Sequence, residues 1–473
     1  MTDDALSRQT EHRSPAPATQ DTIVALSTPM GRSGLGVVRL SGPRALAITC
    51  QLFRPKAAPS LTPHRATFGT LHEPQTDELV DEAVTTFFPG PHSYTGEDVV
   101  EISCHGSPVI LRRVVELALE LGARLARPGE FTLRAFLNGR LDLTQAEAVR
   151  DLIEAQTIYQ TKVALRQLHG SLSQMLQPLK QSLIHAIVHL ETAVEFADED
   201  VTPESRPSLI GRLDDLLTHL SEIEKTFRTG RIVREGIQLA IVGKPNVGKS
   251  SLFNRLLAKD RAIVTEIPGT TRDALSEAAS IDGIPVNLID TAGIRHTTDR
   301  VESIGITRSR QAIADADLVL VVLDASQPLD EDDRTVLHDT AKQPRLIVAN
   351  KNDLPLRWKT ADLEAWGVRE PPISVSALTG DGLDALKQEI LKVVLGGRVH
   401  PEDVILTNVR HHRLIVEAME AVRRAVRALS EGYSEEVALV GLHDALRALG
   451  EITGEVTVED ILDQIFSTFC IGK

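Results

Sequence analysis

The sequence has few cysteines, few aromatic residues and no long apolar stretch. Its 473 residues include three cysteines, Cys50, Cys104 and Cys470, an odd number spread far apart. A disulfide framework is therefore not expected, and the chain is predicted to work in a reducing, cytoplasmic compartment. No apolar run is long enough to span a bilayer, so no membrane contact is expected. Residues 1–20 are polar and lack an apolar core, which predicts a disordered tail and not a signal peptide.

The chain also lacks an excess of positive charge. Lys and Arg number 51 against 66 Asp and Glu, which gives a formal net charge of −15. A protein that holds nucleic acid through a broad basic surface has the opposite balance. Aromatic residues make up only 3% of the chain, so stacking platforms for single-stranded bases are scarce as well. Any contact with RNA is therefore expected to be local or shared with a partner.

The most informative stretch that is present predicts a strand, a glycine loop and a helix. An apolar run at 239–242 is followed by Gly-x-x-x-x-Gly-Lys-Ser at 243–250 and then by apolar residues at helical spacing. The glycines let backbone N–H groups converge on phosphate oxygens, and the start of the helix adds a partial positive charge. Lys249 is predicted to reach the β- and γ-phosphates, and the Ser250 hydroxyl to bind Mg²⁺.

Two further motifs follow in the order that a GTPase requires. Thr271, in a polar stretch after Gly269, is predicted to be the second Mg²⁺ ligand. Asp290 ends a short apolar strand and would hold Mg²⁺ through a water molecule, while the N–H of Gly293 would sense the γ-phosphate.

A base-recognition motif, Asn350-Lys351-Asn352-Asp353, follows another apolar strand. The Asp353 carboxylate can accept hydrogen bonds from guanine N1–H and the exocyclic amine, a pair of donors that adenine does not offer. The motif therefore predicts binding of GTP over ATP. Each motif alone is weak evidence for a GTPase, but the ordered set is strong evidence. Residues from all the motifs are predicted to contact GTP: Asn246, Val247, Gly248, Lys249, Ser250, Ser251, Thr265, Glu266, Ile267, Pro268, Gly269, Thr270, Thr271, Asp290, Thr291, Ala292, Gly293, Asn350, Lys351, Asp353, Ser376, Ala377 and Leu378.

The group that orients the attacking water is not where Ras-like switches carry it. Their Gln after Asp-x-x-Gly is replaced by Ile294, whose side chain cannot orient water. Glu302 is the best nearby acid for orienting the attacking water. The alternative is that Glu302 only lies on a solvated helix face. Asn246 could help to coordinate a monovalent cation where an arginine finger would otherwise neutralise charge. Spacing alone favours the simpler alternative, in which Asn246 only stabilises the turn.

Composition and periodicity divide the chain into domains. The expected fold is multidomain α/β: a tail at 1–20, an α+β domain at 21–140, an all-α helical domain from 141–236 plus 397–473, and an inserted P-loop, Ras-like G domain with a doubly wound sheet at 237–396. The helical domain is expected to be interrupted because both of its parts are amphipathic and the second alone is small for a core.

Local signals place some element ends. A glycine-rich loop is expected at 31–36, before a strand at 37–40. Thr144-x-x-Glu147 is predicted to be a capping box, and Asn408 to cap a later helix.

Several stretches together resemble the MnmE (TrmE) family of tRNA-uridine-modifying GTPases. The likeness covers essentially residues 21–473. Besides the nucleotide motifs, it is carried by Asp21-Thr22-Ile23-Val24-Ala25, Gly36-Val37-Val38-Arg39-Leu40-Ser41-Gly42, Thr95-Gly96-Glu97-Asp98-Val99, Cys104-His105-Gly106, Arg127-Pro128-Gly129-Glu130-Phe131, Arg134-Ala135-Phe136-Leu137-Asn138, Leu141-Asp142-Leu143-Thr144-Gln145-Ala146-Glu147-Ala148 and Phe469-Cys470-Ile471-Gly472-Lys473.

The resemblance implies a function. A GTP-hydrolysing enzyme of this family adds a carboxymethylaminomethyl or aminomethyl group to C5 of the wobble uridine of certain tRNAs, with glycine or ammonium as the alternative amine donors. A 5-formyl- or 5,10-methylene-tetrahydrofolate supplies the one-carbon unit, and the N-terminal domain binds it and builds a homodimer. FAD enters only through a partner, MnmG (GidA), which forms a heterotetramer with the dimer and would bring most of the tRNA contact.

The resemblance also implies folate-binding residues. Arg39, Glu101 and Lys473 match folate-contacting positions, and Arg140 falls where the best-known members carry Lys. A carboxylate such as Glu101 can accept from pterin N3–H and the pterin amine, while basic side chains can meet the glutamyl tail.

A potassium site is implied in the same way. The Asn246 side chain and the carbonyls of Thr265, Ile267 and Thr270 would bind K⁺, and two G domains would dimerise across their switch loops to accelerate hydrolysis. Glu302 falls on the position that orients water indirectly.

Cys470 is the last candidate, with Lys249 and Glu302, for a catalytic role. The Cys470 thiolate could attack C6 of uridine and make C5 nucleophilic. The alternative is that Cys470 is a small residue that packs a terminal helix.

A ribosome-assembly GTPase that binds rRNA is the competing function, but the sequence shows no second G domain, KH-type domain or basic tail. A membrane-remodelling GTPase would need a basic or apolar membrane patch, which is not apparent either.

Overall fold

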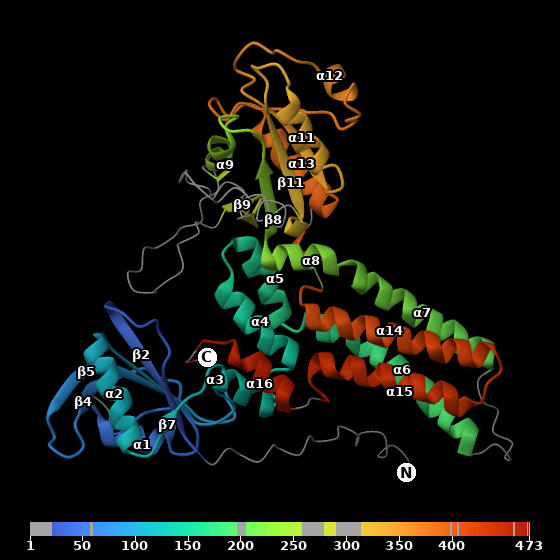
Figure 1. Ribbon diagram of the computed structural model, residues 1–473. Coiled ribbons are helices and arrows are strands. Elements are labelled where there is room, and N and C mark those ends of the chain that lie inside the picture. Colours follow the sequence, from blue (N-terminus) through green and yellow to red (C-terminus); the bar gives the residue numbers. More distant parts are fainter. Residues whose placement is uncertain are drawn as a thin grey trace, which may run out of the picture. The chain divides into compact units, whose positions relative to one another are not determined.

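A computed structural model describes residues 21–56, 60–195, 205–257, 279–289, 314–397, 400–403, 406–456, 459–470 and 472. The chain forms two compact units, each of which Figure 1 shows as ribbons. The described parts of the first unit lie within 21–150 and 450–472, and those of the second within 151–449.

The first unit is built around a mixed sheet. In its described part the strand order is β3-β4-β5-β6-β2-β1-β7, antiparallel except for the β1–β7 pair. The strands are β1 (Ile23–Leu26), β2 (Ser33–Ser41), β3 (Phe53–Pro55), β4 (Thr67–His72), β5 (Leu79–Phe88), β6 (Val99–Gly106) and β7 (Arg124–Leu125). The helices are α1 (Ala45–Leu52), α2 (Pro108–Glu120), α3 (Glu130–Leu137), α4 (Leu143–Glu154, which reaches into the second unit) and α16 (Glu459–Ser467).

The two faces of this sheet have different roles. Helices α1 and α2 cover one face, where alternate residues of β2 and β6 such as Val38 and Ile102 are buried in the core (Figure 1). Because side chains alternate along a strand, Arg39 and Glu101 point to the opposite face. They are direct cross-strand partners in the β2–β6 register.

Strand β2 begins earlier than the glycine pattern indicates. The loop expected at 31–36 is wrong for its last four residues, because β2 starts at Ser33 and pairs with β6 from there, with an irregularity between Ser33 and Leu35. Gly36 is inside the strand and allows close packing: a Cβ there would lie 2.5 Å from the Leu111 side chain on α2. The glycine serves packing and not a turn.

The start of α4 also differs from the prediction. The predicted Thr144–Glu147 capping box is wrong, since both side chains are buried within the helix. Asp142 and Gln145 form the reciprocal pair instead: the Gln145 N–H donates to Asp142 Oδ1 and the Asp142 N–H donates to Gln145 Oε1, both at 2.9 Å. The capping box is therefore shifted by two residues.

Helices in the second unit are α5 (Ile158–Leu168), α6 (Ser171–Glu195), α7 (Arg206–Lys225), α8 (Phe227–Glu235), α14 (Val409–Ser430) and α15 (Glu435–Thr453). Helix α14 packs along α7, and Figure 1 shows the two running side by side. Its predicted cap is confirmed, because Asn408 accepts a hydrogen bond from the Arg410 N–H. Within the described part of the chain, every helix is too short or too polar to cross a bilayer.

The second unit also contains a doubly wound sheet, which confirms the predicted fold class. Among the described residues the order is β13-β12-β11-β8-β10-β9, parallel except for β9. The strands are β8 (Ile237–Val242), β9 (Ala279–Ile281), β10 (Ile284–Ile289), β11 (Leu318–Asp324), β12 (Arg345–Asn350) and β13 (Ile373–Ser374). One face carries α9 (Lys249–Leu257) and α13 (Leu383–Leu395), and the other carries α11 (Glu331–Asp339) and α12 (Thr360–Glu364).

Candidate functional site

The Gly243–Ser250 loop joins the carboxyl end of β8 to the first turn of α9. Both glycines of this loop are needed because other parts of the chain approach them closely. A Cβ on Gly243 would lie 2.3 Å from the Val322 carbonyl oxygen, and a Cβ on Gly248 would lie 2.3 Å from Asn350 Nδ2. Asn246 has a left-handed φ of 64°, so the loop turns sharply before the helix. A glycine loop of this kind before a helix is the arrangement in which backbone N–H groups bind phosphate.

Lys249 lies across this loop. Its Nζ donates to the carbonyl oxygens of Gly243 at 2.8 Å and Lys244 at 2.7 Å. Burial lowers the pKa of Lys249, because a desolvated ammonium is less stable. A bound phosphate would compensate the positive charge of the Lys249 ammonium. Ser250 and Ser251 are exposed in the first turn of α9.

Lys244 fixes the other side of the loop, a role that sequence reasoning missed. Its Nζ contacts Asp330 Oδ2 at 2.6 Å and Asp333 Oδ2 at 2.9 Å. Asp330 caps α11, so the loop is held to the start of that helix. Burial disfavours the Lys244 charge, but the two carboxylates outweigh it and raise the pKa. No local pattern reveals a pair that is 86 positions apart.

Asn350 joins the phosphate loop to the base-recognition loop. It is 1% exposed; its Nδ2 donates to the Val247 carbonyl oxygen at 2.8 Å, and its Oδ1 accepts from the Ala377 N–H at 3.0 Å. Ser376 Oγ in turn donates to Asp353 Oδ1 at 2.5 Å. The exposed Asp353 carboxylate is thereby oriented at the carboxyl end of the sheet, where ligands of doubly wound folds bind.

Asp324, at the end of β11, positions Lys351. Lys351 Nζ contacts Asp324 Oδ2 at 2.6 Å, and Trp358 Nε1 donates to the Asp324 carbonyl oxygen at 2.9 Å. Burial works to raise the pKa of Asp324, but the hydrogen bonds from Lys351 and Ser326 outweigh it and lower the pKa. The predicted pocket residue Leu378 is exposed beside these loops.

The remaining predicted nucleotide and cation residues lie outside the described residues. They are Thr265, Glu266, Ile267, Pro268, Gly269, Thr270, Thr271, Asp290, Thr291, Ala292, Gly293 and Glu302. Lys473, from the predicted folate set, is also outside.

A second group of predicted residues meets on the face of the N-terminal sheet opposite α1 and α2. Arg39 donates from Nε and Nη2 to the same oxygen, Glu101 Oε1, at 2.9 and 2.7 Å. Its Nη1 donates to the carbonyl oxygen of Gly472 at 3.3 Å. The C-terminal segment thus contacts the Arg39–Glu101 pair. Arg140 is exposed beside Gly96, where a Cβ would approach the Arg140 Cγ to 3.3 Å.

The three cysteines differ in their surroundings. All are free, and Cys470 is exposed with its carbonyl oxygen accepting from the Gly129 N–H at 3.4 Å. Cys104 is buried, which raises the pKa of its thiol to about 11 and disfavours the nucleophilic thiolate. Burial also raises the pKa of Cys50. Cys50 and Cys470 are the two cysteines exposed to an external substrate.

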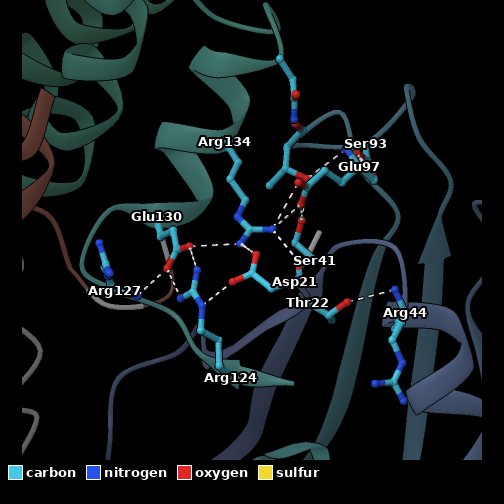
Figure 2. Close-up of polar contacts among 12 residues, drawn as sticks. Asp21, Thr22, Ser41, Arg44, Ser93, Glu97, Arg124, Arg127, Glu130 and Arg134 are labelled. Atoms are coloured by element: carbon cyan, nitrogen blue, oxygen red, sulfur yellow. Dashed lines mark hydrogen bonds and ion pairs between the residues drawn. The ribbon is translucent and has the colours of Figure 1, made fainter. Parts of the chain in front are cut away.

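Several of the motifs that carry the family resemblance converge on an ionic cluster, defined as Asp21, Glu97, Arg124, Glu130 and Arg134, of which Glu130 and Arg134 are buried. Figure 2 shows the Arg134 guanidinium between the three carboxylates. Arg134 is 2% exposed and lies 2.8, 3.0 and 3.1 Å from Asp21, Glu97 and Glu130 respectively. Burial works to raise the pKa of Glu130, but hydrogen bonds led by that from Arg124 outweigh it and lower the pKa.

Strand, phosphate loop and helix, followed by an oriented Asp at the base-recognition loop, define the class: this is a multidomain protein with a P-loop G domain. A family model described as "MnmE helical domain" matches residues 143–470, and one described as "GTP-binding protein TrmE N-terminus" matches residues 22–140. The chain belongs to the MnmE family.

Full-length relatives agree with this assignment. A tRNA modification GTPase MnmE of Koribacter versatilis (strain Ellin345) is 51% identical over 455 residues, which cover 96% of this chain and 99% of the relative. Proteins of the same name from Aquifex aeolicus (strain VF5) and Geobacter sulfurreducens (strain ATCC 51573 / DSM 12127 / PCA) are 48% and 44% identical. Each match covers 96% of this chain, with 100% of the first relative and 99% of the second.

Proposed function

We propose that this chain hydrolyses GTP and, with a FAD-dependent partner of the MnmG type, adds a carboxymethylaminomethyl or aminomethyl group to C5 of the wobble uridine of tRNAs. The observation that carries the proposal is the 51% identity, over 96% of the chain, to a protein named tRNA modification GTPase. The free cysteines fit a cytoplasmic setting. The domain boundaries that we propose are 21–140, 141–236 with 397–473, and 237–396.

GTP binding follows from the arrangement of the G domain. Asp353 would accept from the guanine N1–H and amine, with Ser376 holding one of its oxygens in place. Lys249 would turn from the loop carbonyls to the β- and γ-phosphates. Ser250 and Thr271 would hold Mg²⁺, which supplies charge neutralisation on the phosphates.

Folate binding at Arg39 and Glu101 is the second part of the proposal. Both bonds from Arg39 go to Glu101 Oε1, and Oε2 has no hydrogen bond to any residue that the structure describes. That oxygen can accept from the N3–H and amine of a pterin, so the residues present fit the group. Arg140 and Lys473 would provide cations for the glutamyl tail.

Pairing of two chains is the third part. The face of the N-terminal sheet opposite α1 and α2 exposes Leu35, Phe68 and Val84, of which Phe68 and Val84 are cross-strand partners on β4 and β5. Such a patch fits a second copy of the chain. In the G domain, the exposed Asn246 makes no side-chain hydrogen bond to the described residues and would be available to K⁺.

Nucleoside analysis of tRNA tests the function. We expect cells that lack the protein to lose the modified wobble uridine, and the wild-type gene to restore it. Thr271→Ala should not restore it, because the second Mg²⁺ ligand is lost, and Cys470→Ser should not if the thiolate is the nucleophile. Unchanged wobble uridine in the deletion strain would rule out the proposal, and altered ribosome profiles with normal tRNA would favour the rRNA-binding alternative.

A further inference from the structure

Two aromatic rings enclose the Arg39 guanidinium. Its central carbon, Cζ, lies 5.6 Å from the ring centroid of Tyr94 and 5.6 Å from that of Phe131. The Tyr94 hydroxyl is bonded to Thr132 Oγ1 at 2.8 Å, so the two aromatic segments are also joined to each other. Cation–π attraction from two rings restricts the guanidinium more than one ion pair on an open sheet face does.

Each nitrogen of the Arg39 guanidinium has an acceptor within the protein. Three of its nitrogens bond within the protein, two of them to Glu101 Oε1 and the third to Gly472. Arg39 therefore holds the Glu101 carboxylate through Oε1, which leaves Oε2 able to accept from a ligand. The orientation of Glu101 depends on the position of Arg39, which in turn depends on the rings of Tyr94 and Phe131.

The ionic cluster holds the two segments that carry these rings. Glu97 lies three positions after Tyr94 in the loop before β6, and Glu130 precedes Phe131 at the start of α3. Arg134 bonds to both of these carboxylates. Ser93 Oγ also donates to the Glu97 carbonyl oxygen at 2.5 Å, which ties the loop to itself. Arg134 is the partner that Glu97 and Glu130 share, so its loss would loosen both the loop and the helix.

We propose that Tyr94 and Phe131 are positioning residues of the Arg39–Glu101 site: held by the ionic cluster, they set the Arg39 guanidinium so that Glu101 Oε2 selects ligands with paired N–H donors. This inference rests on the proposed folate function. Tyr94 contributes through Arg39 and not by touching the pterin.

The test measures binding of 5-formyl-tetrahydrofolate and of its 2-desamino analogue to the full-length protein by calorimetry. The analogue lacks the amine donor, so the ratio of its dissociation constant to that of the parent reports the orientation of Glu101. We compare wild type with Glu101→Gln, Tyr94→Leu and Tyr94→Phe. Tyr433→Leu, at an exposed tyrosine in the second unit, is the matched control.

We expect Tyr94→Leu to weaken binding of the parent ligand about tenfold and to lower the ratio toward the value for Glu101→Gln. Tyr94→Phe keeps the ring and should restore most of the ratio, while Tyr433→Leu should match wild type. Thermal unfolding of each variant, followed in parallel, separates these effects from loss of the fold.

Two failures are distinguishable. If wild type does not bind the folate, or Glu101→Gln binds both ligands as wild type does, the proposed folate site is wrong and the inference falls with it. If Glu101→Gln loses discrimination while Tyr94→Leu keeps the wild-type ratio, even with weaker binding, the folate site stands and the positioning role is wrong.

Discussion

At the scale of single residues, the G domain depends on side chains that connect its loops. Asn350 is the clearest case, because one buried amide satisfies a carbonyl of the phosphate loop and an N–H of the base loop. The motif predicts that Asn350 contacts the nucleotide, and the structure shows that its amide links two loops of the protein. The sequence could not reveal this, since Val247 is 103 positions away.

Replacing Asn350 with Ala should therefore weaken nucleotide binding. Each buried partner left unsatisfied costs about 1–3 kcal/mol, so GTP affinity should fall at least about tenfold. Titration with a fluorescent GTP analogue checks this, with Asn352→Ala as the control, whose described hydrogen bond uses only the backbone N–H. Equal affinities for the two variants would contradict the connecting role.

Asp324 should give a pH-dependent contribution to stability. Its pKa is lowered in the folded protein, so its pairing with Lys351 stabilises the fold above the usual carboxyl value of 3.8 and is lost as the pH falls through the folded value. The difference in unfolding free energy between wild type and Asp324→Asn should be constant near neutral pH and shrink below about pH 4. Denaturant titrations across this range are the measurement, and a difference that grows in acid would show the assignment to be wrong.

At the scale of elements, periodicity predicted more than the capping patterns did. The apolar run and glycine loop predicted β8 and α9 because these signals are local. For α4, two overlapping capping patterns are present, and only burial of Thr144 and Glu147 distinguishes them. The ionic cluster joins Asp21 to Arg134 across 113 positions, so its members could be recognised as motifs but not as neighbours.

Helix α4 provides a direct test of its observed cap. Asp142→Ala should cost about 1 kcal/mol at the first turn, so amide hydrogen exchange there should accelerate about fivefold. Exchange within α5, which has its own Thr157–Gln160 capping box, is the internal control and should not change. If first-turn exchange in α4 is unaffected, the Asp142–Gln145 pair does not stabilise the helix end.

At the scale of the whole molecule, the C-terminal segment contacts the N-terminal sheet at Gly472. Gly472 accepts from Arg39 and from Ser27, and a Cβ at Gly472 would lie 2.3 Å from the Leu26 carbonyl oxygen. Gly472 is therefore needed for close approach to the N-terminal sheet, at a φ of 96° that other residues rarely adopt. In the proposed cycle, pairing of two chains would compensate for Ile294, which stands where Ras-like switches carry their Gln.

GTP turnover by the purified protein in KCl and in NaCl, at equal ionic strength and over a range of protein concentrations, tests this central claim most directly. We predict that turnover per chain is at least about tenfold higher in KCl, that it rises with protein concentration, and that Asn246→Ala abolishes the difference between the salts. Turnover that is the same in both salts and independent of protein concentration would contradict the account.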